Sequence, residues 1–163
     1  MTVSRHQKRS ASARKIVLAT GVFDILHPGH LRFLEESKRR GGRGARLVVV
    51  VARDETVLDR KGRRPILPEN ERRRLVQALR VVDSAVLGHK KLDLLGVLQE
   101  VKPKIVTVGY DQNQIRQAVQ KVIDKEKLPI GVVQIRKFGP TPLNSSTKIK
   151  SRIAREQSRN SSR

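Results

Sequence analysis

The sequence predicts an α/β fold in which five parallel strands form one sheet with helices on both faces. The first observation is a set of five short apolar runs rich in valine, isoleucine and leucine, at residues 16–20, 47–52, 85–88, 105–109 and 130–135. The second is the set of helical patterns between them, at about 28–40, 69–82, 92–101 and 112–127, with a last short helix expected from near Ser145. Strands that are apolar on both faces and alternate with helices are typical of parallel sheets.

The bulk composition predicts one domain without membrane spans. A chain of 163 residues is long enough for a substantial core, and 37% of its residues are hydrophobic. No apolar run approaches the length of a membrane span, and residues 1–15 lack the apolar segment of a signal peptide. We therefore expect a cytoplasmic protein. The absence of cysteine excludes disulfides and thiol chemistry.

The formal net charge of +21 predicts attraction to polyanions. Much of this charge lies near the ends, where we expect a disordered basic arm at 1–14 and a disordered basic tail at 154–163, around a folded domain at 15–153. Proteins that bind single strands stack bases on aromatic side chains, and this chain has only three phenylalanines and one tyrosine. We therefore expect no specific nucleic-acid partner. The alternative to an enzyme is a protein that binds RNA through its charge and catalyses nothing.

The end of the first strand predicts a phosphate site. Gly21 lets the backbone approach a ligand closely, and Pro28 suits the first turn of the helix that follows. That helix directs its N-terminal amides and positive dipole end at the end of the strand. His27 and His30 add two side-chain donors at the same place. Zinc needs three or four ligands, and a chain with two other histidines and no cysteine is a poor match for it.

The later elements predict where a ligand binds. Gly41 ends the first helix, and acidic residues at 69 and 71 open the next one after Pro68. In parallel sheets, ligands bind beyond the carboxyl ends of the strands, where the strand order reverses. If the strands follow the Rossmann-like order 3-2-1-4-5, Asp111 after the fourth strand faces the histidine turn. The GxGxxG fingerprint and the Walker A loop are absent, which argues against NAD binding and a P-loop NTPase.

Four signatures along the chain resemble the cytidylyltransferase-type nucleotidyltransferases, whose mark is an HxGH turn after the first strand. The resemblance runs from about Lys15 to Ile153. The signatures are Gly21-Val22-Phe23-Asp24 with His27-Pro28-Gly29-His30; Glu71-Arg72-Arg73-Arg74-Leu75 leading to Arg80-Val81-Val82-Asp83; Gly109-Tyr110-Asp111-Gln112; and Asn144-Ser145-Ser146-Thr147-Lys148-Ile149.

Within that family, three segments are most similar to the archaeal-type FAD synthases: 52–57, 61–69 and 109–112. The resemblance implies transfer of AMP from the substrate ATP to the small molecule FMN, with a divalent metal cation such as Mg²⁺. The alternative is a cytidylyl- or adenylyltransferase for another phosphate acceptor, such as glycerol-3-phosphate, phosphoethanolamine or a sugar phosphate. Glycerol-3-phosphate enzymes usually carry Arg-Thr-Glu-Gly before the last motif, whereas this chain has Arg136-Lys137-Phe138-Gly139-Pro140.

The resemblance implies two sets of site residues. The catalytic set is His27, His30, Lys61, Ser146 and Thr147. The nucleotide-binding set is Val22, Phe23, His27, Pro28, Gly29, His30, Asp111, Arg136 and Ser145. The hydroxyl residues also suit a helix N-cap, which uses the same helix end as phosphate binding.

Other residues keep two interpretations. Asp24 either holds the metal through water or orients the histidine turn, with a capping turn as the simpler alternative. Arg73 and Lys148 either reach the cleft or face solvent. Tyr110 and Phe138 either pack on a ring of the substrate or, for Phe138, fill the core. Dimers are the commonest soluble oligomers, so a homodimer is the leading alternative to a monomer.

Overall fold

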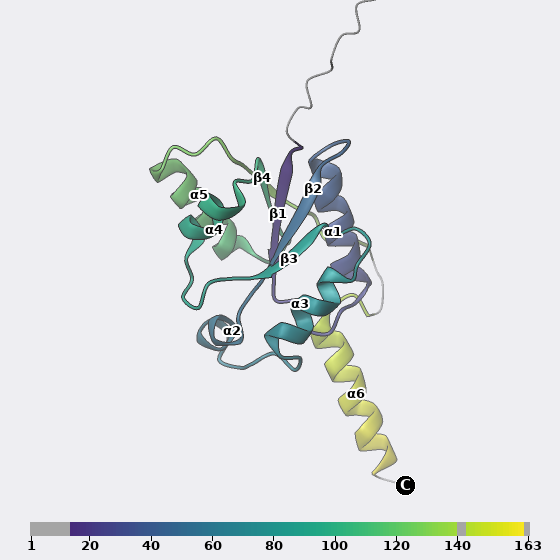
Figure 1. Cartoon of the computed structure of the whole chain (residues 1–163). Helices are drawn as coiled ribbons and strands as arrows, with labels where there is room; N and C mark the ends of the chain where they lie inside the picture. The colour runs from purple at the N-terminus through teal and green to yellow at the C-terminus, as the bar shows by residue number, and fades with distance from the viewer. Residues whose placement is uncertain (1–13, 140–142, 162–163) are drawn as a thin grey trace, which may run out of the picture.

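Five parallel strands form the sheet at the centre of the molecule (Figure 1): β1 (Ile16–Gly21), β2 (Arg46–Val51), β3 (Ser84–Leu87), β4 (Ile105–Val108) and β5 (Gly131–Gln134). The helices are α1 (Pro28–Arg40), α2 (Asp54–Lys61), α3 (Glu69–Gln77), α4 (Leu94–Val101), α5 (Asn113–Lys125) and α6 (Ser146–Asn160). The computed structural model describes residues 14–139 and 143–161. The strand order is β3-β2-β1-β4-β5, which confirms the predicted order 3-2-1-4-5.

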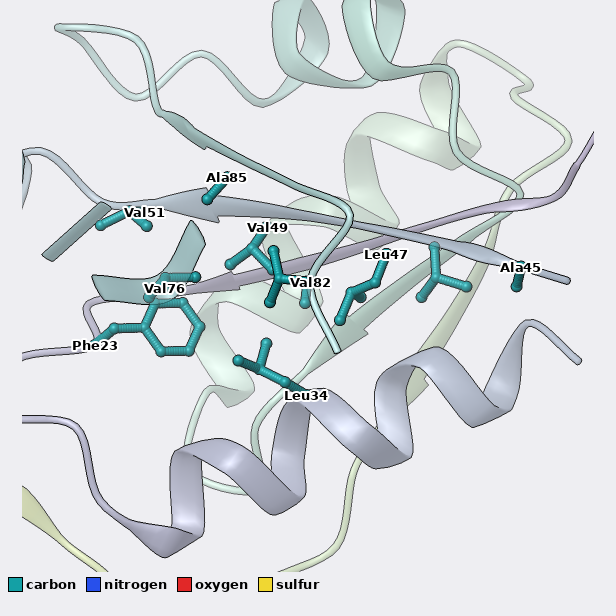
Figure 2. Close-up of a cluster of buried hydrophobic side chains, with 11 residues drawn as sticks. Phe23, Leu34, Ala45, Leu47, Val49, Val51, Val76, Val82 and Ala85 are labelled. Carbon is teal, nitrogen blue, oxygen red and sulfur yellow. The ribbon is translucent and has the colours of Figure 1, made fainter. Parts of the chain in front are cut away.

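Two hydrophobic cores hold the layers together, one on each face of the sheet. Side chains alternate between the faces of a strand, so Val17 of β1 joins one core and Leu18 joins the other. The first core packs beneath α1 and α3, where Leu34 is fully buried (Figure 2). The second core packs beneath α4 and α5, around Leu98 and Val119. This burial on both faces explains the continuous apolar runs in the sequence.

The sheet topology places a crevice beside β1. β1 pairs with β2 on one side and with β4 on the other, and every pairing is parallel. The chain leaves β1 toward β2 and β3, and then crosses back to β4 and β5. The connections after β1 and β4 therefore diverge at the carboxyl edge of the sheet, which is the place where such folds bind ligands.

Three features differ most from the prediction. α2 was not expected, because Val57 is its single buried residue and gives no apolar periodicity. The helix predicted at 69–82 ends at Gln77, and a turn leads on to β3. The folded part was expected to end at residue 153, whereas α6 continues to Asn160. Most of the predicted basic arm lies outside the described residues.

The last helix, α6, extends away from the body of the molecule (Figure 1). It buries none of its residues, and every residue from Ser151 to Asn160 is exposed. Its contacts with the rest of the chain are therefore concentrated in its first turns. Across the two described ranges, the helices all lack the length and apolar character that a membrane crossing requires.

Candidate active site

A cleft of about 620 Å³ opens at the carboxyl edge of the sheet, beyond the ends of β1 and β4. Its volume lies within the range of small-molecule sites. The walls come mainly from five segments, at 20–30, 57–65, 109–114, 135–138 and 144–150. Parts of the chain that are far apart in sequence thus share one cavity.

The histidine turn forms one wall of the cleft. His27 is the N-cap of α1, and its Nδ1 accepts a hydrogen bond from the backbone N–H of His30 at 3.3 Å. The two imidazole rings are stacked with their centroids 3.7 Å apart. Phe23 supports His30 from the core side, with 5.3 Å between the ring centroids. The cap bond leaves Nε2 of His27 as the nitrogen that carries the proton.

Burial keeps both imidazoles neutral. Desolvation lowers the pKa of His27. Desolvation also lowers the pKa of His30 to about 3, with help from the charge of Lys61 and from the neighbouring His27, which would repel a second protonated ring. Nδ1 of His30 is buried and has no hydrogen-bond partner within the described part of the chain. An unpartnered nitrogen is better tolerated without a proton, so Nε2 of His30 is also the donor. The site thus offers two neutral N–H donors to an anion.

The loop before the histidines is held in an unusual conformation. Phe23 and Ile25 have φ angles of 54° and 52°, in the left-handed region that side chains rarely adopt. The ring of Phe23 folds back beneath the end of β1, where a Cβ on Gly21 would lie 2.7 Å from it. This close approach is why glycine ends the strand. Packing of the Phe23 ring in the core fixes the loop.

The histidine turn and the Ser/Thr turn meet directly. A Cβ added to Gly29 would lie 2.8 Å from the backbone oxygen of Asn144, so no larger residue fits between the two turns. Ser146 Oγ also donates a short hydrogen bond to the backbone oxygen of Asp24. Ser145 is the N-cap residue of α6, and Ser145, Ser146 and Thr147 all line the cleft. The imidazoles and the hydroxyls therefore converge on one cavity.

Seven lysine or arginine side chains line the cleft against two carboxylates. Arg60, Lys61, Arg63 and Arg64 come from the end of α2 and the segment after it, and Arg136, Lys137 and Lys150 come from the far side. Glu55 binds Arg64 at 2.6 Å, which neutralises one of these charges. Lys61 and Arg136, both predicted as site residues, are therefore in the cleft. The cleft is a strongly basic cavity that suits a polyphosphate.

Asp111 lines the same cleft as the histidines, as its position after β4 predicts. Its loop is fixed by Gln112, whose Oε1 accepts from the backbone N–H of Gly109 at 2.9 Å. Tyr110 and Phe138 also line the cleft, so Phe138 is not simply a core residue. Lys137 lies 5.6 Å above the centre of the Tyr110 ring. Two aromatic rings are thus available beside the basic wall.

Three predicted candidates lie elsewhere. Pro28 begins α1 but does not line the cleft, although Val22, Phe23 and Gly29 around it do. Lys148 does not line the cleft and donates to Asn144 Oδ1 at 3.3 Å, whereas Lys150 does line the cleft. Arg73 faces β3, where it donates to the backbone oxygen of Ala85 at 3.5 Å.

Both carboxylate oxygens of Asp24 already accept hydrogen bonds. Its Oδ1 accepts from the backbone N–H groups of Ile66 at 2.9 Å and Leu67 at 3.2 Å, and its Oδ2 accepts from Lys150 at 2.7 Å. Burial would raise the pKa of Asp24, but these donors, led by Lys150, outweigh it and hold the pKa below its usual value. No group of three or more histidine, aspartate or glutamate side chains within residues 14–139 and 143–161 is placed to hold a metal ion.

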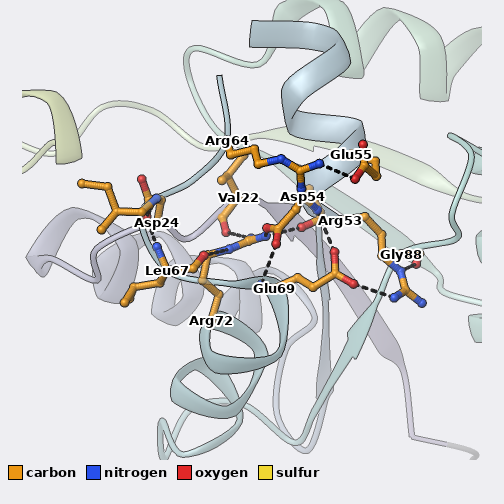
Figure 3. Close-up of polar contacts among 12 residues, drawn as sticks. Val22, Asp24, Arg53, Asp54, Glu55, Arg64, Leu67, Glu69, Arg72 and Gly88 are labelled. Atoms are coloured by element: carbon orange, nitrogen blue, oxygen red, sulfur yellow. Dashed lines mark hydrogen bonds and ion pairs between the residues drawn. The ribbon is translucent and has the colours of Figure 1, made fainter. Parts of the chain in front are cut away.

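A buried arginine behind the cleft was missed by the sequence reasoning. Arg72 of α3 is completely buried, and its guanidinium donates to the backbone oxygens of Val22, Leu67 and Ala52 (Figure 3). It also pairs with Asp54 at 2.7 Å. The guanidinium therefore ties the loop after β1 to the end of β2 and to both neighbouring helices.

The starts of α2 and α3 cap each other beside this arginine. Glu69 accepts from the backbone N–H of Asp54 at 2.7 Å, and Asp54 accepts from the backbone N–H of Glu69 at 3.2 Å. Arg53 adds an ion pair with Glu69 at 2.7 Å. Because a carboxylate stabilises a helix N-terminus, these contacts fix α2 and the basic segment that follows it.

Comparisons with known proteins agree with this geometry. A family model described as cytidylyltransferase-like matches residues 18–152. The chain is 48% identical over 139 residues to the FAD synthase of Methanopyrus kandleri, covering 85% of this chain and 91% of that protein. It is 45% identical over 133 residues to the FAD synthase of Aciduliprofundum boonei, covering 82% and 86%. A crystal structure of a lipopolysaccharide core biosynthesis protein from Thermoplasma volcanium superposes with a TM-score of 0.66 at 43% identity, covering 77% of this chain and 98% of that one.

Proposed function

The chain belongs to the cytidylyltransferase-like family, and we propose that it is an FAD synthase, an FMN adenylyltransferase that moves AMP from ATP to FMN. Relatives of this name match most of the chain. The observation that carries the proposal is the convergence of two neutral imidazoles and three hydroxyl residues on one basic cleft. ATP and FMN both bring phosphates that such a cleft attracts.

The proposed step is a direct displacement at phosphorus. An oxygen of the FMN phosphate attacks the α-phosphorus of ATP and forms the new P–O bond. The bond from the α-phosphorus to the bridging oxygen breaks, and its electron pair leaves with pyrophosphate. The products are FAD and pyrophosphate. The protein forms no covalent bond here, so its contribution is positioning and charge stabilisation.

The residues of the cleft divide the work by their chemistry. The Nε2–H groups of His27 and His30 donate to phosphate oxygens on which negative charge grows. Lys61 neutralises charge on the departing pyrophosphate, and the backbone N–H of Ser146 and the hydroxyl of Thr147 donate from the start of α6. The backbone around Val22, Phe23 and Gly29 holds the triphosphate with Ser145, while Asp111 and Arg136 bind the rest of the nucleotide.

A divalent cation such as Mg²⁺ belongs to the substrate in this proposal. The carboxylate oxygens of Asp24 already accept hydrogen bonds, and the described residues offer no cluster of metal ligands. Mg²⁺ commonly reaches nucleotide sites on substrate phosphates with few protein ligands. We therefore propose that the cation enters with ATP. A location in the cytoplasm, where ATP is abundant, is part of the proposal.

Product analysis tests the function. The purified chain is incubated with ATP, Mg²⁺ and FMN, and both FAD and pyrophosphate are measured. Equal amounts of the two products are expected, with none when FMN is left out. CTP in place of ATP, and glycerol-3-phosphate or a sugar phosphate in place of FMN, form the control panel. Pyrophosphate release with one of those acceptors and none with FMN would support the alternative transferase instead. Light scattering on the same sample distinguishes a homodimer from a monomer.

A further inference from the structure

Asp24 joins three separate parts of the cleft. It lies in the loop after β1, and its carboxylate accepts from Ile66 and Leu67, which follow the basic segment 60–65. The same carboxylate accepts from Lys150 of α6. Its backbone oxygen accepts from Ser146, one turn earlier on that helix. Only 7% of the surface of Asp24 is exposed, so its carboxylate bonds to the surrounding segments rather than to solvent.

The attachment of α6 depends strongly on these contacts. The helix buries no residue, and every residue from Ser151 to Asn160 is exposed. The described contacts between its first turns and the histidine turn are the Ser146 and Lys150 bonds to Asp24, next to the close approach of Asn144 to Gly29. A helix without buried residues receives little stability from packing. Its placement at the cleft is therefore sensitive to the loss of an ion pair.

We propose that Asp24 is a positioning residue for ATP binding, which acts by holding Lys150 and the start of α6 against the histidine turn. This inference rests on the proposed function, because it assigns the cleft to a nucleotide triphosphate. Asp24 itself does not touch the substrate in this proposal. Two carboxylate oxygens hold three N–H donors from two segments, so the groups that would bind the phosphates keep a fixed spacing.

The variant Asp24→Asn tests the inference most directly. Asparagine keeps a carbonyl oxygen for the backbone N–H groups of Ile66 and Leu67, but it loses the ion pair with Lys150. The dissociation constant of ATP, measured by calorimetry without FMN, is expected to rise roughly ten- to hundredfold, the loss expected for a hydrogen bond between charged groups. KM for FMN is expected to stay the same, and backbone amides at 146–150 are expected to exchange hydrogen faster.

Two further variants separate positioning from a general loss of structure. Lys150→Met removes the same ion pair from the other side. The double variant, Asp24→Asn with Lys150→Met, is expected to have the same ATP dissociation constant as the single variant that binds ATP more weakly. Arg152→Gln is the matched control, because Arg152 is on the same helix, exposed, and paired with Glu156 at 3.0 Å. It is expected to bind ATP like the unmodified chain.

The outcomes that overturn the inference are specific. Unchanged ATP affinity in Asp24→Asn, or losses that multiply in the double variant, would show that Asp24 does not act through Lys150. If Asp24→Asn does not fold, Lys150→Gln replaces it, and unchanged amide exchange at 146–150 is then the contradicting result. Failure of the unmodified chain to make FAD would contradict the proposed function alone, since ATP affinity is measured without transfer.

Discussion

The ring of His30 is constrained from two sides in the cleft. It is stacked on His27, supported by Phe23, and kept neutral by burial. Each of these contacts restricts the ring to one orientation, so its donor is already directed when a phosphate arrives. Such preorganised donors stabilise developing charge without reorganisation during the reaction.

Removal of this donor gives the first prediction. His30→Ala is expected to lower kcat by roughly 10²–10³, the usual loss for one preorganised donor. Pyrophosphate release measures the rate, and thermal melting checks that the variant folds. The matched control is His89→Ala, because His89 lies at the surface near α4 and pairs with Asp93 and Glu100. Wild-type turnover in His30→Ala would contradict the role of the histidine turn.

The same burial makes stability depend on pH. Folded His30 stays neutral down to about pH 3, whereas the unfolded chain takes up this proton below its ordinary pKa of 6.5. The unfolded state thus binds more protons between these values, so the free energy of unfolding falls as the pH falls from 6.5 toward 3. Urea midpoints of the unmodified chain and of His30→Gln, measured across this range, check the prediction. The variant, which lacks this titration, is expected to lose less stability, and parallel curves would contradict it.

The choice between Lys148 and Lys150 shows what sequence reasoning lacked at this scale. Residues four apart share a helix face, and Lys150 is four residues after Ser146, which bonds to Asp24. Lys148 is only two residues after it and faces another way. The assignment requires the first residue of α6, which a run of serines and a threonine leaves open by a position or two.

The helix pair α2 and α3 shows that contacts formed only in the fold can also decide whether a whole helix forms. The sequence of α2 contains mostly charged residues, so its amphipathic pattern is weak. It is stable because the starts of the two helices cap each other through Asp54 and Glu69. Such reciprocal contacts exist only in the fold. In contrast, α1 was predicted at its observed bounds, because a proline and a glycine pair mark its ends.

Arg72 was hidden for a related reason. It is the first of three consecutive arginines, and composition does not show which of them is buried. One signal was available, because Val76 lies four residues later and is also fully buried, so the two share the inner face of α3. An arginine on an apolar helix face is expected to find several acceptors, as this one does.

The first element-scale prediction concerns this arginine. Arg72→Met is expected to destabilise the fold by about 3–5 kcal/mol, because one partner of a buried ion pair and several carbonyls lose their donors. Chemical denaturation measures the change. Arg74→Met is the control on the same helix, since Arg74 is exposed, and its effect is expected to stay within about 0.5 kcal/mol. Equal effects of the two variants would contradict the structural role of Arg72.

The contact between α1 and the α6 turn gives a further prediction. Gly29→Ala places a methyl group 2.8 Å from Asn144 O and 2.9 Å from His27 Nδ1, so the two turns must separate. Activity is expected to fall roughly tenfold or more, as for other small displacements in a catalytic site. The melting temperature is expected to change little. Gly131→Ala, whose new Cβ would meet only an ordinary contact at 3.9 Å, is the control. Full activity in Gly29→Ala would contradict the tight approach.

At the scale of the whole molecule, charge and topology act together. The formal net charge is +21, and the cleft at the carboxyl edge concentrates seven of the cationic side chains. The alternation of apolar runs with helices predicted the parallel sheet, and the Rossmann-like strand order 3-2-1-4-5 then gave the place of the cleft. The distribution of charge did not, because a sequence with so many arginines and lysines does not show which of them share a cavity.

This charge predicts that substrate binding depends on salt. Raising KCl from about 0.1 M to about 0.5 M shortens the distance over which charges act, from about 10 Å to well below it. KM for ATP is expected to rise several-fold, with a smaller change in kcat. Steady-state kinetics at the two concentrations measure both. The double variant Arg63→Gln with Arg64→Gln is expected to show a shallower dependence, and a KM independent of salt would contradict the electrostatic role.

The meeting of Gly29 and Asn144 sets the order in which the protein becomes functional during its synthesis. The ribosome releases the histidine turn early, and the sheet has its inner strands well before the hydroxyl turn emerges. A nascent chain therefore presents its histidine turn and its strands first, and its cleft is complete only after the hydroxyl turn has followed. A shortened chain that stops before Asn144 keeps every strand of the sheet and the histidine turn. It lacks the hydroxyl residues that complete the cleft.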